Sequence, residues 1–182
     1  MSALDMFPEV VSEIVPSGET DSWFTPLAQF EEWNLLGRFT LDVAGHPDAP
    51  VSRRIGRFLT EADNGLAQSW VGERVWCNCP YSDITPWVRK AAADIMINTA
   101  GPELVALLLP AWTDRKWWHA HIEPWRDEGW CSGSGNWEFS VRVDFLPGRM
   151  KFGHPNDPEA RLKGAQAASF PSALITMSRR ST

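Results

Sequence analysis

Asn78, Cys79, Pro80 and Tyr81 stand together at the end of an apolar run and combine groups that could hold a planar amine. The Asn78 side chain offers a hydrogen-bond acceptor, and Tyr81 offers an aromatic ring face. Pro80 fixes one backbone torsion and lacks an N–H, which stiffens the turn and can leave neighbouring carbonyl groups facing outward. These residues predict a site that grips an aromatic amino group with two oxygen acceptors and one stacking ring.

This arrangement would suit the methylation of an exocyclic amino group, whose nitrogen lone pair is delocalised into an aromatic ring. Two oxygens that accept the amino hydrogens would draw the nitrogen toward tetrahedral geometry and aim its lone pair at an electrophilic methyl group. No strong base is then needed. The same four letters also fit an ordinary strand-to-helix turn, where Asn and Pro are favoured, so both readings stay open at this point.

The hydrophobic pattern around this motif predicts an open, mostly parallel α/β sheet with flanking helices, because strands and helices alternate in the first half of the chain. In such sheets ligands bind beyond the carboxyl ends of the strands, where the strand order reverses. The motif follows one of these ends. Helices are predicted over 26–37, 84–100 and 113–127, a loop over 129–137, and strands over 38–45, 57–60, 74–78, 103–110, 141–148 and 172–178.

Cap and breaker residues set the expected helix ends. Thr25 is the expected cap of the first helix, with Pro26 at its first position. Thr113 or Asp114 is the expected cap of the third helix, which should end or kink near Pro124.

The composition fits one globular domain, since 182 residues with 43% hydrophobic side chains can bury a single core. Residues 1–20 lack sustained periodicity, and we expect a weakly ordered arm there, followed by one domain over 21–182. No apolar run is long enough to span a membrane and the N-terminus is acidic, so we expect a soluble, cytoplasmic protein. The Cys and His spacings do not match a zinc site, and we expect free thiols and no metal.

The formal net charge of -6 argues against nucleic-acid binding through bulk electrostatics. Any such contact must use local basic clusters, although each cluster taken alone also fits a solvated surface. The eleven tryptophans are expected to be mostly core or half-buried anchors, and a few of them could stack on bases.

Several short motifs follow one another along residues 21–177. WFTP occupies 23–26 and NCPY occupies 78–81, and between and beyond them stand LDVAG, FLTEADNGLAQSW, PWVRKA, LLLPAWTDRKWWH, GRMKFG and FPSALI. Together, and in this order, they resemble the blocks of the phage-encoded DNA N6-adenine methyltransferases, the Dam-like family. The resemblance implies a Rossmann-like, S-adenosylmethionine-dependent methyltransferase fold and methyl transfer to the exocyclic amine of adenine in DNA.

Cys79 departs from the family's Asn-Pro-Pro-Tyr motif, in which the first proline is thought to offer its backbone carbonyl to the target amine. A cysteine retains that carbonyl, so the resemblance implies catalytic roles for Asn78, Cys79, Pro80 and Tyr81. A freed torsion makes the turn less rigid, which leaves an inactive homologue or a shifted substrate as an alternative.

The resemblance implies S-adenosylmethionine as the cofactor. The chain has no G-x-G-x-x-G motif, but Glu61 and Asp63 lie 19 and 21 residues beyond Asp42, near the separation at which nucleotide-binding units place an acid on ribose hydroxyls. Residues 42–45 are assigned to the methionine side, one of the two acids to the ribose or adenine, and 23–26 to a further contact. The predicted cofactor-binding residues are Trp23, Thr25, Pro26, Asp42, Val43, Ala44, Gly45, and Glu61 or Asp63.

DNA is the implied partner, and its target adenine must be flipped out of the duplex or presented in a single strand. Tyr81 is the expected platform for the extruded base. Phosphate contacts are expected from Arg115, Lys116, Arg149 and Lys151. The tryptophan-rich stretch 112–137 is the only region large enough to read sequence, which predicts a short or loose recognition site.

Two alternatives remain open from the sequence. One is a methyltransferase for another planar nitrogen, such as an RNA base or a protein amide, because the same motif chemistry serves these substrates. The other is a catalytically weak or non-enzymatic nucleic-acid-binding homologue whose tryptophans stack on bases.

Overall fold

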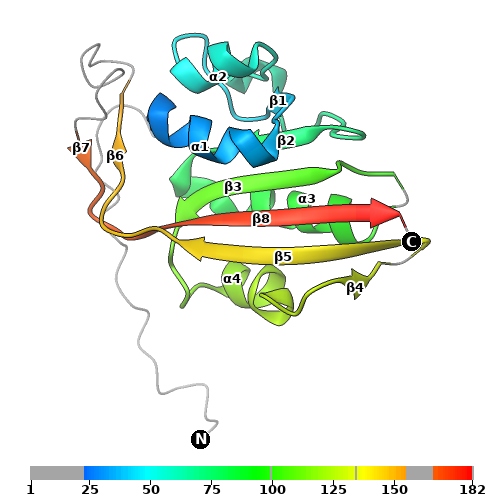
Figure 1. Cartoon of the computed structure of the whole chain (residues 1–182). Helices are drawn as coiled ribbons and strands as arrows, with labels where there is room; N and C mark the ends of the chain where they lie inside the picture. The colour runs from blue at the N-terminus through cyan, green and yellow to red at the C-terminus, as the bar shows by residue number, and fades with distance from the viewer. Residues whose placement is uncertain (1–22, 99, 134, 155–165, 182) are drawn as a thin grey trace, which may run out of the picture.

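The computed structural model describes residues 23–98, 100–133, 135–154 and 166–181. The predicted arm at 1–20 lies outside them, so the predicted domain boundary stays a prediction. Within the described residues, six strands form one sheet in the order β1-β2-β3-β8-β5-β4, and β6 pairs with β7 (Figure 1). The strands are β1 Leu41–Asp42, β2 Arg74–Cys77, β3 Leu104–Pro110, β4 Cys131–Ser132, β5 Trp137–Phe145, β6 Lys151–Phe152, β7 Gln166–Ala167 and β8 Ser172–Ser181.

The sheet combines a parallel half with an antiparallel half. β1, β2 and β3 pair in parallel. β8 pairs antiparallel with both β3 and β5, and β4 pairs antiparallel with β5. The mixed α/β class is therefore confirmed, whereas parallel pairing extends over β1, β2 and β3 rather than over most of the sheet.

The antiparallel half follows from where β8 begins. The Leu146 N–H, just after β5, donates to the Ser172 carbonyl at the start of β8 over 2.9 Å. A strand that starts beside the end of its neighbour runs back antiparallel to it, because parallel pairing needs a crossover to the opposite edge. β5 consequently points the same way as β3, and the carboxyl ends of β1, β2, β3 and β5 share one edge.

The predicted strands at 74–78 and 103–110 are confirmed as β2 and β3, and those at 141–148 and 172–178 fall in the longer β5 and β8. The strand predicted at 38–45 is reduced to β1, because the chain turns after Asp42. The strand predicted at 57–60 is wrong, since that segment makes a single bridge, between Phe58 and Asp42. The predicted loop at 129–137 contains β4 and the start of β5.

The three predicted helices are present but shorter than expected. The third is divided near Pro124, as predicted, into a helix and a 3-10 turn. Among the described residues, no helix has the length and apolar character required to cross a membrane. The helices are α1 Leu27–Gly37, α2 Pro50–Ile55, α3 Ile84–Met96 and α4 Lys116–His121, with 3-10 turns η1 Glu61–Asp63, η2 Tyr81–Asp83 and η3 Glu123–Trp125.

The predicted helix caps are wrong. Pro26 rather than Thr25 is the N-cap of α1, and Arg115 rather than Thr113 or Asp114 is the N-cap of α4. Neither helix start has a side-chain cap hydrogen bond. A threonine hydroxyl is less available to cap a helix when another group engages it. The Thr25 hydroxyl accepts a hydrogen bond from the Asn78 side chain, which lies outside the helix.

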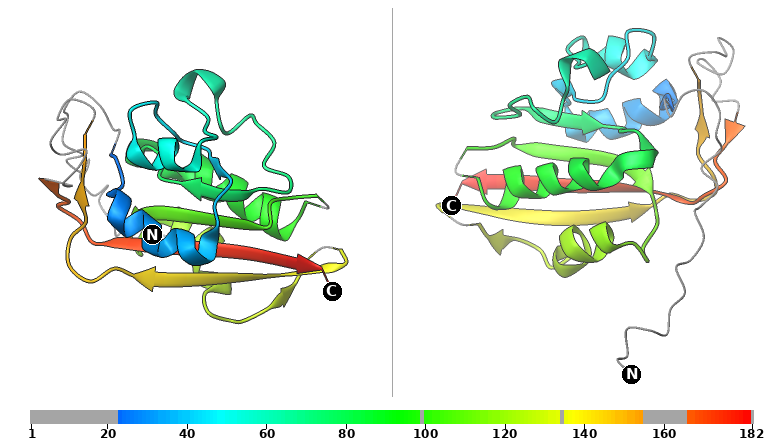
Figure 2. Two further views of the ribbon diagram at one scale, coloured as in Figure 1. Left: turned by 45° about the horizontal axis from the view of Figure 1, so that its top comes forward. Right: turned by 180° about the vertical axis from the view of Figure 1, so that it is seen from behind.

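Aromatic packing fixes the first helix to the parallel half of the sheet. β3 is buried along its whole length, with α3 and α4 on one face and α1 over the other, beside β1 and β2 (Figure 2). Trp76 of β2 meets the Phe30 ring at 5.1 Å between centroids and stacks on Trp33 at 5.6 Å. A buried indole removes a large apolar area from water, so α1 and the WFTP segment before it are held firmly in place.

Candidate active site

β1 lies at a point where the strand order reverses. On one side, the Asp42 N–H donates to the Arg57 carbonyl over 3.0 Å, and the Leu59 N–H donates to the Asp42 carbonyl over 2.8 Å. On the other side, the Val43 N–H donates to the Trp76 carbonyl of β2 over 3.1 Å. The chain thus leaves β1 to one side through α2 and returns to the other as β2. Ligands of open α/β sheets bind outside the strand ends at such a point.

Asn78 directly follows β2 and joins the NCPY motif to the WFTP segment. Its Nδ2 donates to the Trp23 carbonyl and to the Thr25 Oγ1, the latter over 3.1 Å. Its Oδ1 accepts a hydrogen bond from the Tyr81 hydroxyl over 2.8 Å. The half-buried amide is therefore held on both sides, and two motifs separated by 53 positions meet at one side chain.

Tyr81 is buried, with 4% of its surface exposed. Its hydroxyl also lies 3.2 Å from the Leu108 carbonyl of β3. Its ring contacts the Phe152 and Phe170 rings edge to face, with centroids 6.1 and 5.5 Å away. The predicted stacking of Tyr81 on an extruded base stays a prediction.

Cys79 and Pro80 shape the turn between β2 and η2. Pro80 is exposed, with φ −55°, and its carbonyl accepts the Asp83 N–H over 3.3 Å. Cys79 is buried beside Cys77, and burial raises the pKa of the Cys77 thiol well above its usual value, so that thiol stays neutral. No donor among the described residues occupies the Cys79 carbonyl, which leaves it as a backbone acceptor one residue after the side-chain acceptor of Asn78.

Asp42 points into the turn that follows β1. Its Oδ2 accepts the Ser52 hydroxyl over 2.7 Å, and its Oδ1 accepts the Ala44 N–H over 3.2 Å. The Ser52 Oγ in turn accepts the His46 N–H over 3.1 Å. Burial raises the pKa of Asp42 to about 6, and the two hydrogen bonds oppose that rise. Both carboxylate oxygens are thus engaged inside the protein, and Asp42 shapes the predicted cofactor turn.

Two glycines allow the chain to approach this turn closely. A Cβ atom on Gly45 would lie 2.7 Å from the Phe58 Cβ and 3.0 Å from the Ser52 Oγ. A Cβ atom on Gly65 would lie 2.0 Å from the Val43 carbonyl oxygen, a clash with backbone. Neither Gly65 nor Ser52 was predicted as a site residue, because no motif spacing points to either of them.

Glu61 and Asp63 lie on η1, just beyond the segment that pairs with β1. The Asp63 Oδ2 accepts both the N–H and the hydroxyl of Thr60 at 2.7 Å, and these bonds lower the pKa of Asp63. Asp63 is therefore a capping carboxylate. The exposed Glu61 carboxylate has no hydrogen bond or ion pair with the described residues. Of the two acids left open by the sequence, Glu61 is the one with neither carboxylate oxygen engaged by the described residues.

The segment around β6 joins the site through the WFTP motif. The backbones of Phe24 and Gly153 exchange two hydrogen bonds of 2.8 Å. The Trp23 ring lies 6.0 Å from the Phe152 ring and 6.1 Å from the His154 ring. These contacts were not predicted, because nothing in the sequence pairs 24 with 153. They bring the exposed Lys151 to the same edge of the sheet as Asn78.

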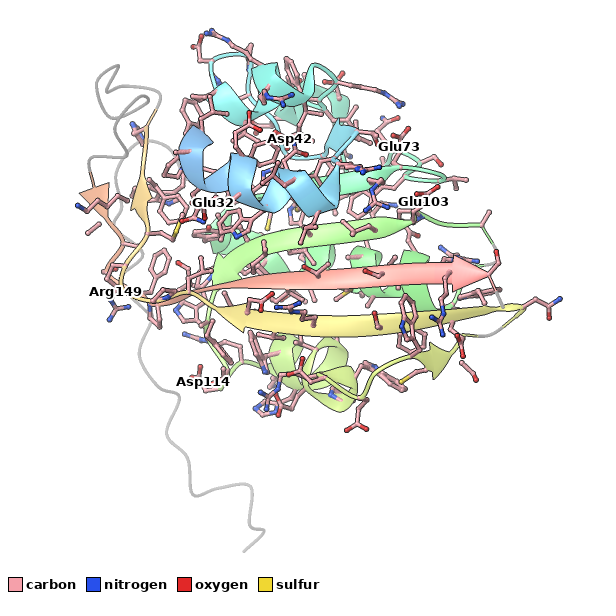
Figure 3. All side chains as sticks on the ribbon, in the orientation of Figure 1. Glu32, Asp42, Glu73, Glu103, Asp114 and Arg149 are labelled. Atoms are coloured by element: carbon pink, nitrogen blue, oxygen red, sulfur yellow. The ribbon has the colours of Figure 1, made fainter. Side chains whose placement is uncertain are left out.

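The predicted phosphate-binding residues also lie at this edge. Figure 3 shows Arg149 and Asp114, the residue before Arg115, at the end of the sheet opposite Glu73 and Glu103. Arg149 and Lys116 are exposed. The half-buried Arg115 guanidinium lies 5.5 Å from the Trp112 ring centroid, and its Nε lies 4.0 Å from an Asp114 carboxylate oxygen.

Comparison with known proteins identifies the class to which this α/β fold and site belong. Residues 13–169 match the DNA N-6-adenine-methyltransferase (Dam) family, so the chain belongs to that family. The chain is also similar to the DNA N-6-adenine-methyltransferase of Haemophilus phage HP1 (strain HP1c1), with 27% identity over 101 residues. This alignment covers 54% of the chain and 55% of that relative, so it spans about half the length of each. The resemblance seen in the sequence motifs is thereby confirmed.

Proposed function

We propose that the chain is a DNA N6-adenine methyltransferase that uses S-adenosylmethionine to methylate the exocyclic amine of adenine, and that it has the Rossmann-like fold of such enzymes. Family membership supports the reaction class. The observation that carries the proposal is the junction at Asn78, where the NCPY turn, the WFTP segment and the carboxyl end of β2 meet. Consecutive residues there offer the Asn78 side-chain oxygen and the Cys79 backbone carbonyl, which accepts no hydrogen bond from the described part of the chain.

For this reaction the protein has to hold and orient one amino group. Asn78 Oδ1 would accept one amino hydrogen and the Cys79 carbonyl the other, which reduces the delocalisation of the nitrogen lone pair. Oriented acceptors aimed at the developing charge of a transition state provide large rate enhancements. This role requires no titrating base at position 78.

The residues around β1 fit the proposed cofactor. Glu61 offers an uncommitted carboxylate for ribose hydroxyls, next to the turn that Asp42 and Ser52 hold in shape. Trp23 and Pro26 are partly exposed beside Asn78 and would form the wall on the other side. When bound, S-adenosylmethionine supplies the electrophilic methyl group. We propose that Asp42 acts indirectly, through the turn.

DNA would approach the edge that carries Arg149, Lys151 and Lys116. These exposed cations can neutralise phosphates, and each such contact adds to the salt dependence of binding. Because adenine hides its amino group inside a duplex, the base must be flipped out or be unpaired to reach Asn78.

The test is transfer of a labelled methyl group to unmethylated DNA, with N6-methyladenine identified in the digested product. Wild type should transfer label, and Asn78→Ala should lower the rate at least about a hundredfold, as expected for the loss of a transition-state hydrogen bond. Asn136→Ala, at an exposed position before β5, is the matched control and should behave as wild type.

Parallel reactions with RNA and with a protein extract separate the proposal from its alternatives. Label in RNA or protein but not in DNA would assign the activity to another planar nitrogen. No transfer by wild type, or unchanged transfer by Asn78→Ala, would rule out the proposed function.

A further inference from the structure

The orientation of the Asn78 amide is dictated by its neighbours. A backbone carbonyl can only accept hydrogen bonds, so the group that faces the Trp23 carbonyl must be the amide NH2. The second amide hydrogen points to the Thr25 Oγ1 at 3.1 Å. The amide oxygen is then turned to the opposite side, where the Tyr81 hydroxyl donates to it over 2.8 Å.

Thr25 is well placed to hold this orientation. It is 3% exposed, and the segment that carries it is fixed by α1 on one side and by the Phe24 pairing with Gly153 on the other. Its hydroxyl caps no helix. A buried hydroxyl that caps no helix and receives an amide hydrogen from Asn78 is placed to hold that side chain rather than the helix.

An aspartate at position 78 would place an acceptor where the asparagine places a donor. An ionised carboxylate only accepts hydrogen bonds, and one of its oxygens would then face the Trp23 carbonyl oxygen with no hydrogen between them. The buried Asp42 differs, because its two oxygens face the Ser52 hydroxyl and the Ala44 N–H, which are donors. The fold therefore provides donors at position 42 and an obligate acceptor at position 78.

We infer that Trp23 and Thr25 are positioning residues that lock the Asn78 amide with Oδ1 toward the target amine, which makes position 78 selective for asparagine over aspartate. The kinetic consequences of this inference rest on the proposed function. The fixed orientation of the Asn78 amide rests on the hydrogen-bond geometry alone.

The Tyr81 hydroxyl completes the lock on the oxygen side. It carries one hydrogen and, among the described residues, has two acceptors within reach, the Asn78 Oδ1 at 2.8 Å and the Leu108 carbonyl at 3.2 Å. A small rotation transfers the hydrogen to Leu108 and leaves the Asn78 oxygen to the substrate amine. The hydroxyl keeps a hydrogen bond in both positions, so the exchange leaves no buried donor unsatisfied.

The first test compares Thr25→Val with Thr25→Ser. Valine keeps the shape and removes the hydroxyl, so kcat should fall about tenfold, the size of effect that one uncharged hydrogen bond supports. Serine retains the hydroxyl and should restore kcat to within about twofold of wild type. Unchanged kcat in Thr25→Val, or an effect confined to cofactor affinity, would overturn the inference, as would failure of a folded Thr25→Ser variant to recover.

The second test is Asn78→Asp, followed as a function of pH. At neutral pH the variant should lose at least about tenfold in kcat, because its charge faces the Trp23 carbonyl without a donor. Protonation of the new carboxyl supplies a donor, so the ratio of its kcat to that of wild type should rise as the pH is lowered. Wild-type activity of Asn78→Asp at neutral pH would refute the inference.

The third test does not depend on catalysis. The side-chain NH2 resonances of Asn78, identified by their absence in Asn78→Asp, should show slow hydrogen exchange in wild type and faster exchange in Thr25→Val. Rapid exchange in wild type would overturn the lock even in a protein that transfers no methyl group. Conversely, active wild type with normal Thr25→Val and Asn78→Asp kinetics would leave the proposed function intact and remove only the inference.

Discussion

Polar side chains are satisfied in different ways at the carboxyl ends of the parallel strands β1 and β2 and in the antiparallel half of the sheet. At the carboxyl ends of β1 and β2, polar side chains are buried or half-buried and are satisfied by other buried groups, as Asp42 is by Ser52 and Asn78 by Thr25. In the antiparallel half, charges pair on the surface, as Arg180 does with Glu138 and Arg142 with Asp144. Buried polar networks fix geometry and are costly to disturb, whereas exposed ion pairs contribute little. We propose on this basis that the carboxyl ends of β1 and β2 form the site and that the antiparallel half supports it.

The largest expected effect is that of Gly65→Ala. The new Cβ would lie 2.0 Å from the Val43 carbonyl oxygen, so the turn after β1 must move. We expect the free energy of unfolding to fall by about 3 kcal/mol, at the upper end for overpacking, and cofactor binding to be lost. Chemical denaturation and calorimetric titration with S-adenosylmethionine measure the two effects.

Gly101→Ala is the matched control at the other edge of the sheet, with a Cβ 2.1 Å from the Asp94 carbonyl oxygen. It should lower stability similarly and leave the affinity of the folded protein for the cofactor unchanged. Equal loss of affinity in both variants would contradict the separation of site and support.

The next effect concerns the pH dependence of stability. Because the pKa of Asp42 is raised from 3.8 to about 6, the folded state holds this proton more tightly than the unfolded state. The contribution of Asp42 to the free energy of unfolding should therefore be largest below pH 3.8 and fall by up to about 3 kcal/mol as the pH rises through about 6. Asp42→Asn should flatten this part of the curve. Denaturation midpoints across the interval check it, and identical slopes in both proteins would count against the assignment.

A smaller effect distinguishes the two acids of η1. Glu61→Gln should weaken binding of S-adenosylmethionine about tenfold, close to 1.4 kcal/mol, because a charge-assisted hydrogen bond is lost. Asp63→Asn should leave the affinity unchanged, because Asp63 caps η1 through Thr60. Titration calorimetry on both variants decides the matter, and the reverse order of affinities would exchange the two roles.

The smallest effect is expected in the antiparallel half. Arg180 pairs with Glu138 over 2.6 Å and lies 4.1 Å from the Trp130 ring centroid, but its side chain is about half exposed. Arg180→Ala should lower stability by no more than about 1 kcal/mol and leave methyl transfer unchanged. A loss of activity in this variant would show that the antiparallel half takes part in the site.

The sequence predicted those parts of the fold that local pattern controls. The buried run of β3 and the helix over α3 follow from apolar spacing, and both were predicted correctly apart from the helix end. The direction of β8 was not predictable from its own letters, because a strand's hydrophobic pattern does not record which edge the chain enters from. The cap of the first helix was wrongly predicted for a similar reason, because the Thr25 hydroxyl binds the distant Asn78 side chain rather than its own helix.

What the sequence determined by itself was the set of chemical groups: an asparagine, an aromatic ring and a stiff turn after an apolar run, together with ordered motifs that identify the family. The tertiary structure alone decided which of these groups face one another. It turned Asp42 inward, left the Glu61 carboxylate without a partner among the described residues, buried Tyr81 and set the Trp23 carbonyl against Asn78. A hydrogen bond requires its two groups to lie about 3 Å apart. Separation along the sequence does not reveal which groups come that close, because the fold decides it.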